Sequence, residues 1–65
     1  MKILLDEYMF KNNLTTRQVS IATGIPPTTI NYIVNGKISP KMITMEKLAK
    51  GLKIHISDLY ESNFK

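Results

Sequence analysis

Residues 14–36, LTTRQVSIATGIPPTTINYIVNG, contain start and stop signals for helices at short intervals, and these signals constrain the fold more than any other feature. Thr15 and Gln18 have the Thr-x-x-Gln spacing of a capping box, which marks the beginning of a helix. Gly24 follows, and glycine tolerates the left-handed conformation that ends a helix. The sequence therefore predicts a helix over residues 16–23.

A second helix is predicted directly after this one. Pro26-Pro27 opens it, because proline is accepted at the first helical position and restricts the residue before it. Asn35-Gly36 ends it, so we expect it to span residues 27–35. Its apolar residues recur at helical spacing, at Ile30, Ile33 and Val34. Two helices joined by so short a turn cannot lie antiparallel, so we expect them to cross steeply, as in a helix-turn-helix.

The rest of the chain also has helical periodicity, and no segment alternates long enough to predict a strand. Sixty-five residues make one domain at most, so we expect a single domain over residues 1–65. The predicted fold is all-α with five helices, of which the second and third form the helix-turn-helix. The further helices are expected over residues 2–12, from residue 40 or 42 to residue 52, and over residues 57–61.

Two of these further helices carry specific expectations. The apolar stripe of the fourth helix is predicted at Met42, Met45, Leu48, Ala49 and Leu52. Gly51 lies inside this helix, and Lys53 follows it. Ser57 is expected to cap the last helix, with Asp58 in its first turn, where a carboxylate suits the helix dipole.

The charges of the chain are unevenly distributed. Nine lysine and arginine residues against five acidic residues give a net charge of +4. No aspartate or glutamate occurs from Tyr8 to Met45, the interval that holds the whole helix-turn-helix. A polyanion that approaches this part of the chain meets only positive or neutral groups, which favours a nucleic acid as partner.

Composition excludes several other classes of protein. The chain has no cysteine, which excludes disulfides and thiolate metal sites and fits a cytoplasmic protein. No apolar run is long enough to cross a membrane, and no signal peptide is visible. His55 is the single histidine and has no carboxylate pair nearby, so we expect no enzyme activity and no cofactor.

The segment resembles the helix-turn-helix of the XRE family, the phage Cro and C1-type repressors. Matching positions are Leu14, Thr15, Val19, Gly24, Ile25, Thr29, Ile30, Ile33 and Gly36. The resemblance implies a lambda-repressor-like domain that binds double-stranded operator DNA and regulates transcription, most commonly as a repressor. In such domains the second helix of the motif enters the major groove.

The resemblance also implies which side chains meet the bases. With the apolar stripe of the third helix set aside, the outward residues are Pro27, Thr28, Asn31 and Tyr32. The family pattern directs Pro27, Thr28 and Tyr32 at the bases, whereas Asn31 is a base or a phosphate contact. This helix has no lysine or arginine, so we expect an operator read in part through A·T content and DNA shape.

Phosphate contacts are expected on both sides of the recognition helix. The start of the second helix offers free backbone amides, which attract a phosphate. The residues predicted to bind phosphates are Thr16 and Arg17 at that start, and Asn35, Lys37 and Lys41 around the following loop. The family usually has glutamine at the Thr16 position, and a threonine hydroxyl reaches less far.

Proteins of this family usually bind DNA as homodimers. Tyr60 and Phe64 near the C-terminus are candidate interface residues, and Ile21 is a second candidate. An alternative function is a protein-binding module such as an antitoxin, which uses the same fold to neutralise a toxin. A third is an RNA-binding or purely structural helix-turn-helix.

Overall fold

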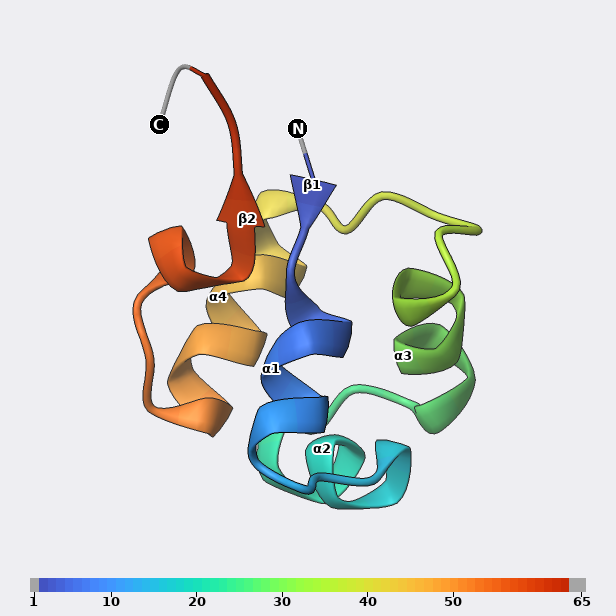
Figure 1. The fold of residues 1–65 in the computed structure, drawn as a ribbon. Helices are drawn as coiled ribbons and strands as arrows, with labels where there is room; N and C mark the ends of the chain where they lie inside the picture. The colour runs from blue at the N-terminus through green and yellow to red at the C-terminus, as the bar shows by residue number, and fades with distance from the viewer. Residues whose placement is uncertain (1, 64–65) are drawn as a thin grey trace.

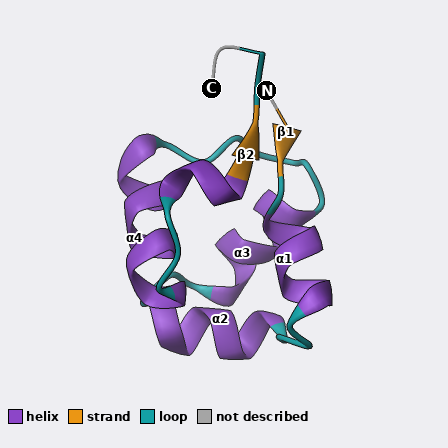
Figure 2. Ribbon diagram, turned by 60° about the vertical axis from the view of Figure 1, so that its left-hand side comes forward, coloured by secondary structure: helices purple, strands orange, loops and turns teal. Residues whose placement is uncertain are grey.

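The computed structural model describes residues 2–63, which form mainly helices together with one short two-stranded sheet (Figure 1). Both strands lie at the end of the molecule opposite α2 in the two views (Figures 1 and 2). None of these helices, in the part of the chain that the structure describes, combines the length and apolar character that crossing a bilayer requires. The elements are β1 (Lys2–Ile3), α1 (Leu5–Lys11), α2 (Thr16–Thr23), α3 (Pro27–Val34), α4 (Met42–Leu52), the 3-10 helix η1 (Ile56–Leu59) and β2 (Tyr60–Glu61).

Helix α2 begins and ends as the sequence predicts. Thr15 Oγ1 accepts a hydrogen bond from the Gln18 amide at 3.1 Å, and Gln18 Oε1 accepts one from the Thr15 amide at 2.8 Å. This reciprocal pair confirms the capping box. At the other end Gly24 has φ +76°, and its amide donates to the carbonyl of Ser20. The bounds of α2 are therefore set by a side-chain cap at one end and a left-handed glycine at the other.

Helix α3 follows after a short turn and ends one residue earlier than predicted. Pro26 is its N-cap residue and provides no side-chain hydrogen bond, so the first amides of α3 have no side-chain cap. Asn35 ends the helix, and its amide donates to the Asn31 carbonyl at 2.9 Å. Gly36 then adopts φ +72°, which turns the chain away from the helix axis.

The core is entirely apolar among the described residues, and every α-helix contributes to it. This confirms the predicted apolar stripe of α3, with Ile30 and Ile33 buried and Val34 partly buried against the core. The core residues are Leu5, Met9, Val19, Ile25, Ile30, Ile33, Met45, Leu48, Ala49 and Leu59. Five helical segments thus share one small core, and the remaining faces of α2 and α3 stay at the surface.

One position of the predicted α4 stripe is wrong. Met45, Leu48 and Ala49 are buried, but Met42 is 63% exposed. Met42 is the first residue of α4, and the buried residues of this helix begin one turn later at Met45. Helical spacing alone does not show where along its length a helix first meets the core.

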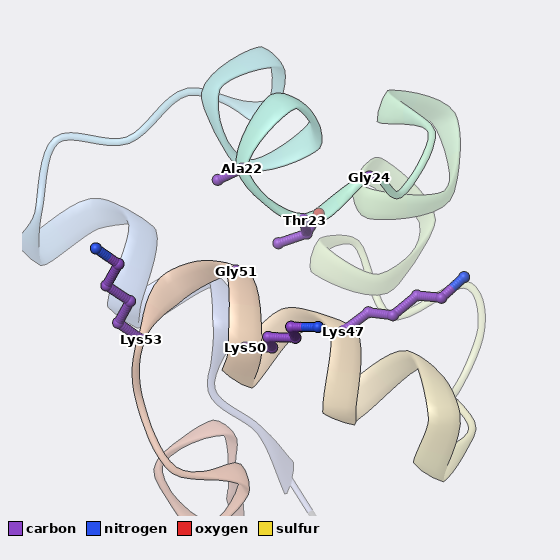
Figure 3. A pocket seen from close by; sticks show the side chains of 7 residues that line it. All are labelled: Ala22, Thr23, Gly24, Lys47, Lys50, Gly51 and Lys53. Carbon is purple, nitrogen blue, oxygen red and sulfur yellow. The ribbon is translucent and has the colours of Figure 1, made fainter.

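Gly51 of α4 lies close to Ala22 and Thr23 at the C-terminal end of α2 (Figure 3). A Cβ atom at this position would lie 2.6 Å from the Ala22 carbonyl oxygen and 2.7 Å from Thr23 Cα. Both distances are shorter than real Cβ contacts, and both atoms belong to the backbone of α2. Glycine inside a helix usually weakens it, so its presence here follows from this close approach.

The chain ends differ from the prediction. Lys2–Ile3 is not helical, because this segment pairs with Tyr60–Glu61 in an antiparallel sheet with Lys2 opposite Glu61 and Ile3 opposite Tyr60. The Leu4 amide also donates to the Leu59 carbonyl at 2.8 Å. Strands of two residues are too short to give an alternating pattern, and their pairing depends on the folded helices.

The predicted fifth α-helix, residues 57–61, is also wrong. The segment is a 3-10 helix that begins at Ile56, and Ser57 is not its cap. Instead, Asp58 Oδ2 accepts a hydrogen bond from the His55 amide at 3.1 Å, and the Asp58 amide donates to the His55 carbonyl at 3.0 Å. Asp58 therefore closes the turn around His55, two residues earlier than predicted.

Candidate nucleic-acid interface

The outer face of α3 presents polar and aromatic side chains to solvent. Ile30 and Ile33 anchor the helix in the core, which turns its opposite side outward. Tyr32 is 49% exposed. The four residues predicted to contact bases are all exposed, namely Pro27, Thr28, Asn31 and Tyr32. This face is therefore accessible to a partner along the length of the helix.

The N-terminus of α2 offers hydrogen-bond donors beside this face. The first hydrogen bond within the helix runs from the Val19 amide to the Thr15 carbonyl, and the Gln18 amide is taken by the Thr15 side chain. The amides of Thr16 and Arg17 precede these bonds and remain available at the positive end of the helix dipole. The Arg17 side chain is exposed. This end can bind an anion.

A hydrogen bond joins this end of α2 to α3. Thr16 Oγ1 donates to Asn31 Oδ1 across 2.9 Å. A hydroxyl group carries one proton, and phosphate oxygens only accept hydrogen bonds. While this bond is present, the Thr16 hydroxyl has no proton left for a phosphate. The structure thus brings together a residue expected at a phosphate and a residue expected at a base or a phosphate.

The loop after α3 carries the other predicted phosphate contacts. The amides of Lys37 and Ile38 donate to the Tyr32 carbonyl at 2.8 and 3.4 Å, which folds the loop against the end of α3. Asn35 and Lys37 are exposed at this end, and Lys41 is exposed at the start of α4. Because the loop folds back, the backbone of Lys37 lies against the last turn of α3.

A second basic surface was missed by the sequence analysis. Lys47, Lys50 and Lys53 line a cleft of about 600 Å³ between the end of α2 and α4 (Figure 3). The floor is formed by the residues of the close α2–α4 approach, and no carboxylate of the described residues lines the cleft. The three-residue spacing of these lysines could have indicated a basic surface. The lysines lie outside the acid-free interval from Tyr8 to Met45, on which the charge argument was based.

The described residues offer no alternative site for a metal ion. No group of three or more histidine, cysteine, aspartate or glutamate side chains lies close enough together among residues 2–63. The one ion pair found among them joins Lys2 and Glu7 at 3.5 Å on the exposed surface.

Comparison with known proteins agrees with this geometry. A helix-turn-helix family model matches residues 7–59, which extend from α1 to the end of η1. The chain belongs to the helix-turn-helix family. This match confirms the resemblance to XRE-type proteins, and membership supports a DNA-binding regulator rather than an enzyme.

This helix-turn-helix protein also has a curated relative. It is 24% identical over 58 residues to an uncharacterized HTH-type transcriptional regulator, YvzC, of Bacillus subtilis (strain 168). The aligned region covers 89% of this chain and 75% of that relative. No solved structure matches the chain.

Proposed function

We propose that this helix-turn-helix protein is a sequence-specific regulator of transcription that binds double-stranded operator DNA and acts as a repressor of the Cro or C1 type. The observation that carries this proposal is the exposed polar face of α3, with free amides on one side and a basic loop on the other. The relative YvzC, whose name describes a transcriptional regulator, supports the same assignment.

Helix α3 is proposed to enter the major groove. Thr28 and Pro27 present apolar groups that suit thymine methyls, and Tyr32 adds an exposed aromatic side chain. The helix carries no lysine or arginine, so the common bidentate contact to guanine is absent. Recognition then depends on A·T-rich sequence and on groove shape to a larger extent than usual.

Backbone contacts are proposed to hold α3 in this position. The amides at the start of α2 and the Arg17 side chain bind one phosphate. Lys37 and Lys41, with Asn35 between α3 and the loop, bind phosphates on the other side. These contacts place the helix in the groove and contribute no sequence information of their own.

We further propose that two copies bind a near-palindromic operator. Half-sites about 34–36 Å apart place two recognition helices in successive major grooves on one face of the duplex. Ile21 on α2 is 76% exposed, which suits an interface residue. Tyr60 is half-buried in β2, and Phe64 lies outside the described residues. Among the candidate interface residues, Ile21 is therefore the first to substitute in a test of dimerisation.

Titration of labelled upstream DNA of the gene at several salt concentrations tests the proposal. About four to six phosphate contacts predict a slope of about −4 to −5 in a plot of log affinity against log salt, for each protomer. Random duplex of the same length gives the non-specific affinity. A protein that binds both duplexes equally, or neither, contradicts the proposed function.

Lys37→Gln sharpens this experiment. We expect it to weaken binding to all duplexes similarly and to reduce the salt slope by about 1. Lys2→Gln is the matched control, because Lys2 is an exposed lysine in β1, outside the proposed interface. Equal slopes for Lys37→Gln and the wild type would show that this loop does not contact the DNA backbone.

A further inference from the structure

The hydrogen bond from Thr16 to Asn31 connects residues that are fifteen positions apart in the sequence. It joins the first residue of α2 to the outer face of α3. Asn31 is exposed, and Thr16 is half-buried. The family resemblance implies that the Thr16 position binds a phosphate, but the hydroxyl proton that such a contact needs is donated to Asn31.

A DNA phosphate bound at the start of α2 would not need the Thr16 hydroxyl. The amides of Thr16 and Arg17 precede the first hydrogen bond within α2, and the Arg17 side chain is exposed. A backbone phosphate can be bound by these groups alone. The Thr16 hydroxyl is then free to act on its neighbour in α3.

The bond restrains the Asn31 amide. An exposed asparagine can rotate about its last side-chain torsion and present either its oxygen or its nitrogen outward. The Thr16 hydroxyl holds Oδ1 on the α2 side, and no acceptor within residues 2–63 engages Nδ2. The Nδ2 protons therefore remain for acceptors in the major groove, such as purine N7, while one Oδ1 lone pair also stays unused.

Resting on the proposed DNA-reading function, we propose that Thr16 is a positioning residue for base readout by Asn31, and not a phosphate ligand. The bond fixes the direction of the amide before DNA arrives. The Asn31 side chain then loses less conformational freedom on binding, which favours the correct base over the other bases. Thr16 thereby affects sequence preference without touching a base.

The test compares sequence preference across four proteins: the wild type, Thr16→Val, Thr16→Ser and Asn31→Ala. Each selects its preferred sites from a randomised duplex library, and affinities are then measured for the wild-type site, its single-base variants and a random duplex. Valine keeps the shape of threonine but has no hydroxyl, whereas serine keeps the hydroxyl. Thermal unfolding of each variant monitors the fold.

We expect Thr16→Val and Asn31→Ala to flatten the preference at the same base pair. Discrimination there should fall by about 5- to 10-fold, which lies at the lower end of what a good side-chain pair to a base edge contributes. Thr16→Ser should keep the wild-type preference. The affinity of Thr16→Val for random duplex and its salt slope should equal those of the wild type.

Three results would overturn the inference. A uniform loss of affinity for all duplexes in Thr16→Val, with a shallower salt slope, would make the hydroxyl a phosphate ligand. An unchanged preference in Thr16→Val, with a flattened one in Asn31→Ala, would show that the bond does not position the amide. An unchanged preference in Asn31→Ala would remove Asn31 from readout. Failure of the proposed function is distinct, because then the wild type itself selects no sequence.

Discussion

The two ends of α2 meet the rest of the molecule in different ways. At the C-terminal end the backbone of α2 lies so close to α4 that Gly51 has no room for a side chain. At the N-terminal end a hydrogen bond between polar side chains, Thr16 and Asn31, joins α2 to α3. One end has no room for added atoms, whereas the other carries a polar contact at the surface.

This difference separates stability from the proposed DNA contacts within one short helix. The close end fixes the position of α2 and tolerates no added atoms. The other end keeps its first amides and the Arg17 side chain accessible. Substitutions at the two ends should therefore change different measurements, and the following predictions test that separation.

The largest effect is expected at the close end. Gly51→Ala places a methyl group against the backbone of α2, which cannot move aside as a flexible side chain would. We expect the free energy of unfolding to fall by about 3 kcal/mol, a typical upper cost of overpacking. Urea denaturation measures it. Lys50→Ala on the exposed side of α4 is the control, and an equally stable Gly51→Ala variant would contradict the close approach.

The next effect concerns the face of α3. Tyr32→Ala should reduce discrimination between the preferred duplex and single-base variants by about 2 kcal/mol, because an exposed contact to the bases is lost. Thr28→Ala should act in the same direction. Competition binding measures the change. Phe10→Ala, which removes an aromatic side chain that is 86% exposed on α1, should leave discrimination unchanged.

A smaller effect is expected at the capping box. Thr15→Ala removes the acceptor for the Gln18 amide and should lower the free energy of unfolding by about 1 kcal/mol. Thr15→Ser keeps the acceptor and should retain most of the stability. Thermal unfolding distinguishes the two variants. If both lost the same stability, the cap would not be the reason why α2 starts where it does.

The smallest effect is expected in the second basic surface. Lys47→Gln and Lys50→Gln remove charge from the cleft between α2 and α4, outside the proposed interface. At physiological salt, charges beyond about 8 Å are largely screened, so DNA affinity should change less than 2-fold. The same titration used for Lys37→Gln measures it. If these variants lost as much DNA affinity as Lys37→Gln, the DNA-binding surface would extend onto α4.

The sequence predicted the central motif well because its signals are local. Thr15 and Gln18 define one end of α2, Gly24 defines the other, and each acts within a few residues. The exposed face of α3 follows from the burial of Ile30 and Ile33 on the opposite side. Short-range spacing suffices for such features, and the exposure of the four α3 residues predicted to contact bases followed from it.

The remaining features depend on contacts between distant segments. The pairing of Lys2–Ile3 with Tyr60–Glu61 requires a folded helical core between the two strands, so no local sequence pattern predicts it. The requirement for glycine at position 51 follows from the close approach of α2, which the local sequence does not indicate. The partner of the Thr16 hydroxyl is likewise set by the crossing of α2 and α3.

The pairing of β1 with β2 has a practical consequence for engineering. Lys2 and Glu61 are neighbours across the sheet, at the end of the molecule away from α2 (Figure 1). Two copies fused in tandem would thus start from adjacent attachment points, and the linker would need to span the gap between protomers instead of wrapping around either one. For the proposed two-copy operator, such a single-chain dimer would raise the effective concentration of the second DNA-binding domain and lower the protein concentration needed to occupy both half-sites.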